Sequence, residues 1–513
     1  MFNQLNPKMH DPMAPKRLSD IISDVPVVQL FGPVDASVQG ITTDSREVKP
    51  GWVFVALDGE HVDGHKFVNK AIESGASVVV IQEAQYEKSL KELLTPSYVQ
   101  HNGTTVVIVR STRIACAILS DRFYDSPAQE MRSVGITGTN GKTTVSYLLE
   151  SIIAHAGLKP GVIGTIEYRS AGKATPAKYT TPAPEILHGV LRDMKRDNCD
   201  AFIMEVSSHA LSLDRIYGMT FDVSIFTNLT QDHLDFHGTM DDYAYCKARL
   251  FSDHTAQVSI INNDDPYASV MLRRANGRKW TYGTSNDCDY TMSVVSNPSN
   301  GLIVEITHKD ETDTVSSELQ GFFNAYNITA AYTGALALGI EREAIIQGIR
   351  AIQNVPGRFE LYEGPDGKRA IVDYAHTPDA LKNVLQEARK IIPDNRNLIL
   401  VFGCGGDRDI DKRPKMGKIA AEGSDTVIVT NDNPRTENPE EIVAQILAGI
   451  PEGYSNISVI YDREAAIHTA IEKSQPGDIV LVAGKGHEEY QVIGHLRRQF
   501  SDSSIVKDAL GIT

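Results

Sequence analysis

The segment GITGTNGKTT, residues 135–144, constrains the fold most, because it joins an apolar strand to a helix through a glycine-rich turn. Residues 132–136 have the pattern of a short strand, and residues 145–154 have that of an amphipathic helix. The small residues between them let backbone N–H groups point inward, beside a helix N-terminus, as polyphosphate binding requires. Lys142 is then expected to reach the terminal phosphates, and Thr143 to offer its hydroxyl to Mg²⁺.

The spacing of this loop departs from the usual phosphate-loop pattern of Gly, four residues and then Gly-Lys-Ser/Thr. Counting back from Gly141 places Ile136 where the first Gly belongs, and Gly135 lies one position too early. An ordinary strand–helix turn is the alternative. It is less well supported, because the strand, the glycines, the lysine and the two threonines occur in the required order.

Strands alternate with helices along most of the chain, which predicts an α/β fold with parallel, doubly wound sheets. We expect a loose polar tail at residues 1–16, a small α/β domain at 17–127 and a central domain with the phosphate loop at 128–354. A C-terminal Rossmann-like α/β domain is expected at 355–513, after the Pro-Gly break in VPGRFE. Period-two alternation at residues 288–310 predicts an antiparallel patch within the central domain.

Composition narrows the functional class. A formal net charge of −16 argues against broad binding to nucleic acid or to membrane surfaces, but not against a locally basic site for ATP. Five scattered cysteines without a CxxC pattern indicate a reducing compartment. The first residues lack the apolar core of a signal peptide, and no later run is long enough to span a bilayer, so we expect a cytoplasmic protein.

Charged residues follow several of the expected strands. Glu205 ends a strand of the central domain, where a carboxylate can bind Mg²⁺; a salt bridge is the structural alternative. His233 and Lys247 follow another strand of that domain, and a structural role is the alternative for His233. The Lys247 ammonium cannot bind a metal, so it would either pair with phosphate or be converted to an anion. In the last domain Arg408, Arg435 and Glu488 follow three strands and together suit a ligand with several charges. For any one of them alone, a solvent-exposed loop charge is the better interpretation.

The motifs as a set resemble those of the Mur ligases, the ATP-dependent enzymes that add amino acids in peptidoglycan synthesis. They occur in the order TGTNGKTT, MEVSSHAL, TNLTQDHLDFHG, YCKARLF, GFFNAYN, VPGRFE, DYAHTPDAL, FGCGGDRD, DNPR and AGKGHEEY. The resemblance covers nearly the whole chain after the tail. It also accounts for the irregular loop, which in this family starts at Thr-Gly-Thr.

The resemblance implies roles for individual residues. Those implied for ATP are Gly138, Thr139, Asn140, Gly141, Lys142, Thr143, Thr144, Asn327, Arg358 and His376. Those implied for a UDP-sugar peptide are Thr43, Ser45, Glu60, His61, Val62, Thr180, Thr181, Ser207 and Arg215. Those implied for diaminopimelate are Arg408, Asp432, Asn433, Pro434, Arg435, Gly484 and Glu488. Two Mg²⁺ ions would be held by Thr143, Glu205, His233 and Lys247, the last as an N6-carboxylysine formed with CO₂.

The implied catalytic residues are Lys142, Glu205, His233 and Lys247, and the first domain would bind the nucleotide sugar. The implied reaction joins meso-2,6-diaminopimelate to UDP-N-acetylmuramoyl-L-alanyl-D-glutamate through an acyl phosphate, in a monomeric enzyme. Tyr179 and Leu213 depart from the amides that some family members use to touch the sugar peptide, so we assign those two residues no contact.

The alternatives are an L-lysine-adding member, a folylpolyglutamate synthetase-like ligase, an ATP-binding switch or motor, and a non-enzymatic scaffold. TTDSR and DNPR have no place in a folylpolyglutamate synthetase. Arg435 favours diaminopimelate over lysine, because a lysine side chain would leave its guanidinium unpaired.

Overall fold

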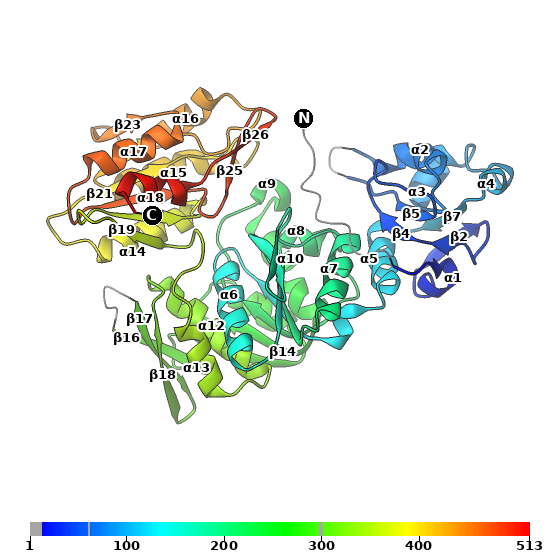
Figure 1. Cartoon of the computed structure of the whole chain (residues 1–513), viewed down its shortest axis with the longest axis horizontal. Coiled ribbons are helices and arrows are strands. Elements are labelled where there is room, and N and C mark those ends of the chain that lie inside the picture. The colour runs from blue at the N-terminus through cyan, green and yellow to red at the C-terminus, as the bar shows by residue number, and fades with distance from the viewer. Residues whose placement is uncertain (1–12, 60–61, 297–300, 513) are drawn as a thin grey trace. The chain divides into compact units, whose positions relative to one another are not determined.

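The computed structural model describes residues 13–59, 62–296 and 301–512, which form an α/β protein with three large sheets (Figure 1). The expected α/β class with parallel sheets is confirmed. The described chain divides into two compact units. One comprises the residues up to 135 with 157–224 and 249–258; the other comprises 136–156, 225–248 and 259 onward. The expected domain boundaries after residues 127 and 354 fall inside these units and stay predictions.

The first sheet has the strand order β2-β7-β6-β5-β4, and its strands are parallel except for the antiparallel pair β2/β7. Its strands are β2 (Val27–Phe31), β4 (Gly40–Thr42), β5 (Trp52–Val55), β6 (Val78–Gln82) and β7 (Thr105–Val109). The helices of this region are α1 (Leu18–Ile21), α2 (Val68–Glu73), α3 (Glu83–Gln85), α4 (Pro96–Asn102) and α5 (Thr112–Phe123). Lys16, expected to end the tail, lies in the short strand β1 (Lys16–Arg17), which pairs with β3 (Ser37–Val38).

Both faces of this sheet are buried, which explains why its strands read as continuous apolar runs. In β6, Val78 and Val80 pack with α1 and α5, whereas Val79 and Ile81 pack with α2 and α4. The alternation follows from the period of two along a strand.

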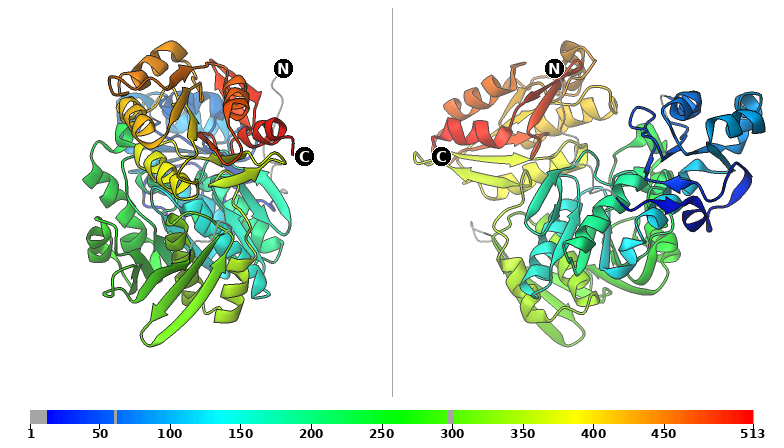
Figure 2. Two further views of the ribbon diagram at one scale, coloured as in Figure 1. Left: turned by 90° about the vertical axis from the view of Figure 1, so that its left-hand side faces the viewer. Right: turned by 45° about the vertical axis from the view of Figure 1, so that its right-hand side comes forward.

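The central sheet has eleven strands in the order β11-β10-β9-β12-β8-β13-β14-β15-β16-β17-β18. Its strands are β8 (Arg132–Thr137), β9 (Pro160–Ile163), β10 (Glu167–Ser170), β11 (Lys173–Pro176), β12 (Ala201–Glu205), β13 (Phe221–Phe226), β14 (Thr255–Asn262), β15 (Arg278–Gly283), β16 (Tyr290–Ser296), β17 (Leu302–His308) and β18 (Glu311–Ser317). Strands β16 to β18 form a long antiparallel ribbon, green to yellow-green in Figures 1 and 2, which confirms the expected antiparallel patch. A second antiparallel segment, β9 to β11, was not expected from the sequence.

The phosphate-loop helix α6 (Lys142–His155) packs against α12 (Phe323–Ala337) and α13 (Arg342–Arg350). Gly348 permits this approach, because a Cβ there would lie 2.4 Å from the Cα of Ile152. The other helices of the middle of the chain are α7 (Pro184–Arg196), α8 (Ser208–Ser212), α9 (Leu234–His237), α10 (Met240–Asp253) and α11 (Ala268–Arg274).

The third sheet has the order β19-β20-β24-β21-β22-β23, parallel except for the pair β19/β20. Its strands are β19 (Glu360–Glu363), β20 (Arg369–Asp373), β21 (Leu398–Phe402), β22 (Thr426–Val429), β23 (Ile457–Val459) and β24 (Ile479–Ala483). Helices α14 (Pro378–Lys390), α15 (Lys412–Gly423) and α16 (Pro439–Leu447) cover one face; α17 (Arg463–Lys473) and α18 (Asp502–Leu510) cover the other. The hairpin β25 (Tyr490–Ile493) and β26 (Leu496–Gln499) follows β24.

The chain thus presents loops at the carboxyl ends of parallel strands, where open α/β sheets bind ligands. Across the part of the chain that the structure describes, every helix is too short or too polar to cross a membrane.

Candidate nucleotide and substrate sites

The phosphate loop joins β8 to α6, as the sequence predicts, and its glycines are required by close contacts. A Cβ on Gly138 would lie 1.9 Å from Thr227 Oγ1, and a Cβ on Gly141 would lie 2.4 Å from Asn327 Oδ1. Gly141 is also in the left-handed region, with φ 87°, at the start of α6. The loop is therefore held against the end of β13 on one side and against α12 on the other.

Two lysines converge on one carbonyl of this loop. Lys142 Nζ donates to Gly138 O at 2.7 Å and to Thr139 O at 2.9 Å, and Lys247 Nζ donates to Gly138 O at 2.9 Å. Lys247 is 1% exposed, and its Nζ lies 4.7 Å from the ring centroid of Tyr243. Burial, and then the neighbouring Lys142 cation, hold the pKa of Lys247 well below its ordinary value. The buried position of Lys247 therefore favours the neutral amine over the ammonium.

Arg358, from the expected Pro-Gly break, reaches the same loop. Its Nη2 donates to Thr143 Oγ1 at 3.1 Å, and its guanidinium lies 4.6 Å from the ring centroid of Tyr374. The residues are 215 positions apart, so the contact depends on the tertiary fold. Arg358 thus contacts the hydroxyl that the sequence assigns to Mg²⁺.

His233 begins the short helix α9 with a left-handed backbone, φ 53°. Asp232 Oδ2 lies 3.3 Å from His233 Nε2 and 3.8 Å from Nε2 of His376, another residue implied for ATP. Burial favours the neutral acid, but the two imidazoles and a nearby ammonium outweigh it, so the pKa of Asp232 is lowered. The sequence motifs did not single out Asp232, although it stands beside His233 in DHLDFHG.

Glu205 lies at the end of β12, is 1% exposed and accepts two hydrogen bonds from Thr165. Thr165 N donates to Oε1 at 3.1 Å, and Thr165 Oγ1 lies 2.8 Å from Oε2. Gly164 allows the carboxylate this position, because a Cβ there would lie 2.6 Å from Oε1. Sequence reasoning did not single out Gly164 or Thr165.

Around Glu205 the structure brings together four residues implied for the sugar peptide. Thr181 Oγ1 donates to Glu205 O at 2.7 Å and lies 3.4 Å from Ser207 Oγ, while Thr180 Oγ1 lies 3.1 Å from Thr165 Oγ1. Arg215 Nη1 donates to Thr181 O at 2.7 Å. The Arg215 guanidinium also lies 5.3 Å from the ring centroid of the half-exposed Tyr179.

Thr43 points toward α7, where its Oγ1 donates to Glu185 Oε1 at 2.7 Å. Cys116 Sγ on α5 lies 3.7 Å from the other carboxylate oxygen, and burial raises the pKa of Glu185. Glu185 was not expected to take part in a site. Ser45 is buried and Val62 is exposed. Glu60 and His61 lie outside the described residues.

In the third sheet, three neighbouring parallel strands end in the loops that carry the residues implied for diaminopimelate. Residues 403–411 follow β21, residues 430–438 follow β22 and residues 484–489 follow β24. Arg435 has a left-handed backbone, φ 52°, and its Nη1 donates to Gly406 O at 2.7 Å. Asn433 Nδ2 donates to Glu488 Oε2 at 2.8 Å, and a Cβ on Gly484 would lie 2.8 Å from Asp432 Oδ2.

Arg408 is exposed and donates to Asp407 O at 2.9 Å. The loop that carries it is held by the fully buried Arg413, which sequence reasoning missed. Arg413 Nη2 donates to Gly405 O at 3.0 Å, and both terminal nitrogens donate to the carboxylate of Glu437 at 2.8 and 2.9 Å. The three strand exits therefore form one polar edge of the sheet, as the sequence predicts.

Within residues 13–59, 62–296 and 301–512, no group of three or more His, Cys, Asp and Glu side chains is arranged to hold a metal ion. The Mg²⁺ ligands implied by the sequence therefore remain predictions. The Thr143 hydroxyl and the Glu205 carboxylate still suit Mg²⁺, because both supply hard oxygen ligands.

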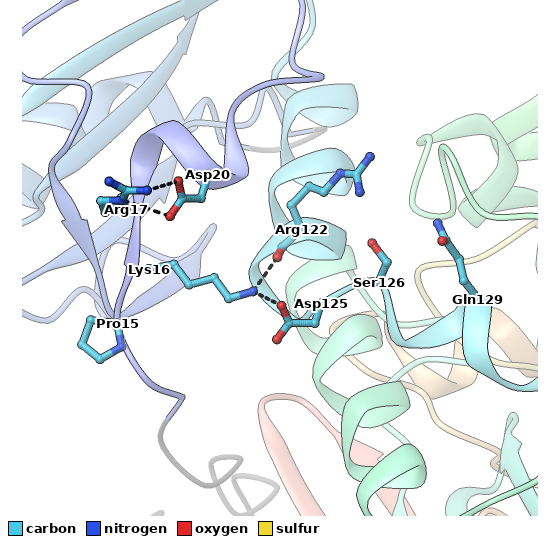
Figure 3. Close-up of a pocket in the computed structure, with 8 residues that line it drawn as sticks. All are labelled: Pro15, Lys16, Arg17, Asp20, Arg122, Asp125, Ser126 and Gln129. Atoms are coloured by element: carbon cyan, nitrogen blue, oxygen red, sulfur yellow. Dashed lines mark hydrogen bonds and ion pairs between the residues drawn. The ribbon is translucent and has the colours of Figure 1, made fainter.

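Figure 3 shows a pocket elsewhere on the chain, between the start of the described residues and the end of α5. Lys16 Nζ donates to Arg122 O at 2.9 Å and pairs with Asp125, and Arg17 pairs with Asp20. Its residues are Pro15, Lys16, Arg17, Asp20, Arg122, Asp125, Ser126 and Gln129. None of these eight residues belongs to the implied sites, and the charged side chains Lys16, Arg17, Asp20 and Asp125 pair with one another.

Three family models match the chain in succession. They are the Mur ligase family catalytic domain over residues 37–124, the Mur ligase middle domain over 136–335 and the Mur ligase glutamate ligase domain over 357–486. Together they span most of the residues around the sites described above.

Similar proteins of nearly equal length carry one name, UDP-N-acetylmuramoyl-L-alanyl-D-glutamate--2,6-diaminopimelate ligase. The relative from Aquifex aeolicus (strain VF5) is 42% identical over 476 residues, covering 92% of this chain and 94% of the relative. The relative from Gloeobacter violaceus (strain ATCC 29082 / PCC 7421) is 43% identical over 481 residues, covering 93% and 94%.

A solved structure with the same name superposes with a TM-score of 0.66 at 32% identity and covers 97% of this chain and 99% of that one. A folylpolyglutamate synthase from Mycobacterium tuberculosis, solved with ADP and AMPPCP, has a TM-score of 0.61 at 18% identity. It covers 73% of this chain and 92% of its own, and it shares the fold alone. The matching domains and the near-full-length relatives show that this chain belongs to the Mur ligase family.

Proposed function

We propose that this chain is an ATP-dependent ligase that joins meso-2,6-diaminopimelate to UDP-N-acetylmuramoyl-L-alanyl-D-glutamate, a step of peptidoglycan precursor synthesis. The observation that carries the proposal is the polar edge of the third sheet. There Arg435 has a left-handed backbone and donates to Gly406 O, and the strands that precede Arg435 and Glu488, β22 and β24, flank β21. The names of the near-full-length relatives support the same substrates.

In the first step, a γ-carboxylate oxygen of the D-glutamyl residue attacks the γ-phosphorus of ATP, the bond to the bridging oxygen breaks, and ADP departs. The residues of the phosphate loop bind and orient the polyphosphate, and Lys142 places its ammonium beside the charge that develops. Arg358, already at Thr143 Oγ1, supplies a second cation at the loop.

In the second step, the amino group of diaminopimelate attacks the acyl carbon of the acyl phosphate, phosphate leaves and the nitrogen loses a proton. Water would hydrolyse that intermediate, so the residues around it must exclude water until the amine arrives. Arg435 and Arg408 would bind carboxylates of the amino acid, and Glu488 would accept from an ammonium.

We further propose that Lys247 reacts with CO₂ to form a carbamate, with loss of one proton. A neutral amine is the reactive form, and the burial of Lys247 at the phosphate loop favours it. Thr143, Glu205, His233 and the Lys247 carbamate would hold two Mg²⁺ ions, which when bound would neutralise charge on the transferring phosphoryl group. A cytoplasmic location and a monomeric state are part of the same proposal.

The test is a ligation assay with the UDP-muramoyl dipeptide, ATP and Mg²⁺, in which meso-diaminopimelate and L-lysine are offered separately. The wild type should form product with diaminopimelate and release phosphate only when both the dipeptide and the amine are present. Equal use of lysine would favour the lysine-adding alternative, and phosphate release without an amine would favour an ATP-binding switch.

Arg435→Ala should lower kcat/KM for diaminopimelate about thirtyfold, since a charge-assisted hydrogen bond contributes about 2 kcal/mol, and should affect lysine much less. Arg273→Ala, which removes an exposed arginine on α11, is the matched control and should leave both values unchanged. Equal losses for both amino acids in Arg435→Ala would contradict the assignment of this residue.

A further inference from the structure

Lys485, in the loop that follows β24, is fully buried and connects two residues of the implied amino-acid site. Its Nζ donates to Glu488 Oε2 at 2.7 Å and to Asn433 Oδ1 at 3.1 Å. Asn433 Nδ2 donates to the same Glu488 Oε2 at 2.8 Å. The three side chains therefore form a closed ring of hydrogen bonds across the exits of β22 and β24.

This ring fixes how the two site residues face a ligand. Val492 N also donates to Asn433 Oδ1, at 2.9 Å, so the orientation of the Asn433 amide is determined by two donors. Both hydrogen bonds that the structure gives the Glu488 side chain end on Oε2, which leaves Oε1 to accept from a ligand ammonium. The Glu488 side chain is 15% exposed, so it is accessible from the edge of the sheet.

The ring also sets the charge of the pocket. The Lys485 ammonium balances the charge of Glu488, and the loop after β22 adds the cation of Arg435 and the carboxylate of Asp432. A ligand end that carries only an ammonium, such as the side chain of lysine, would approach the Lys485 cation and would offer no carboxylate to the pocket's own cations. A ligand end that carries an ammonium and a carboxylate together would bring a partner for Arg435 as well as for Glu488.

We propose that Lys485 is a positioning residue that determines amino-acid specificity: its buried charge makes the pocket select a zwitterionic end over a lone ammonium. The inference rests on the proposed function, because it concerns the same amino-acid site. Lys485 itself would contact no ligand and would act through Glu488 and Asn433.

The decisive variants are Lys485→Gln, which keeps a hydrogen-bond donor but removes the charge, and Lys485→Met, which removes both. In each, Glu488 loses its cation, so the ratio of kcat/KM for L-lysine to that for meso-diaminopimelate should rise at least ~tenfold, mainly through a lower KM for lysine. In Lys485→Met with Glu488→Gln the charge balance is restored, and the ratio should return toward the wild-type value. Thermal unfolding and nucleotide binding report whether each variant is folded.

A merely structural lysine would give a different pattern: lower kcat for both amino acids, with the ratio unchanged in both single variants. That result would overturn the inference while leaving the proposed function intact, provided that the wild type prefers diaminopimelate. A wild type that ligates lysine alone, or neither amino acid, would overturn the proposed function and this inference together. If Lys485→Met does not fold, Lys485→Gln decides on its own, since it retains a donor to Glu488.

Discussion

His188 on α7 is buried against α5 in a way that should make the stability of this chain depend on pH. Its side chain is 0% exposed, and among the described residues neither ring nitrogen has a hydrogen-bond partner. Asp121 Oδ1 lies 3.4 Å from Nδ1 and favours the charged ring, but burial outweighs it and lowers the pKa of His188 to about 4. The imidazole is therefore neutral in the folded protein at pH 7.

The pH dependence of the unfolding free energy follows from the difference in proton binding between the folded and the unfolded chain. An unfolded chain protonates this histidine near pH 6.5, whereas the folded chain resists protonation until about pH 4. Between those values the unfolded state binds the additional proton, so stability falls as the pH falls. The difference of about 2.5 pKa units, at ~1.4 kcal/mol per unit, corresponds to about 3 kcal/mol of unfolding free energy.

His188→Leu removes the titrating group and fills a similar volume with an apolar side chain, so it should cost little at pH 7. Urea unfolding should be measured for wild type and variant between pH 7.5 and pH 4. As the pH falls, the free energy of unfolding should decrease less in the variant than in the wild type. Hydrogen exchange in α5 and α7 would localise the difference if the chain unfolds in more than one transition. His101→Leu, at an exposed position in α4, is the control. Parallel pH profiles for wild type and His188→Leu would refute the reasoning.

Further predictions concern the buried ion pair, the phosphate loop and the carbamate. Arg463→Met should lower the free energy of unfolding by about 3–5 kcal/mol, because the Arg463–Asp502 pair is fully buried and Asp502 would lose its partner. A change below about 1 kcal/mol in urea unfolding would contradict this prediction. Gly141→Ala should weaken ATP binding at least ~tenfold in calorimetry, since the new Cβ meets Asn327 Oδ1 at a left-handed position; unchanged affinity would show that the loop tolerates a side chain. Removal of CO₂ should lower the rate of ligation by the wild type at least ~tenfold. Added bicarbonate should restore the rate in the wild type but not in Lys247→Ala, and a rate that is insensitive to CO₂ would exclude a functional carbamate.

Much of the architecture follows from local patterns. The alternation of apolar strands with amphipathic helices predicts parallel sheets, and the structure has them on either side of β6 and within the third sheet. The strand–loop–helix at residues 132–154 corresponds to β8 and α6, and the period-two stretch near residue 300 corresponds to β16 and β17. Periodicity and turn residues determine such elements because they depend on neighbours only a few positions away.

The pairings that define the sites depend on strand order and helix packing instead. The sequence indicated that Arg435 and Glu488 follow strands of one sheet, but the ring that Lys485 closes depends on β22 and β24 flanking β21. Likewise Thr43, which follows β4, and Glu185 on α7 are 142 positions apart, and only the fold brings their side chains together. The sequence alone thus determined the elements, the phosphate loop and the family to which the chain belongs. Only the tertiary structure decided which polar side chains share a partner, because such contacts join distant segments whose spacing along the chain carries no information about their distance in space.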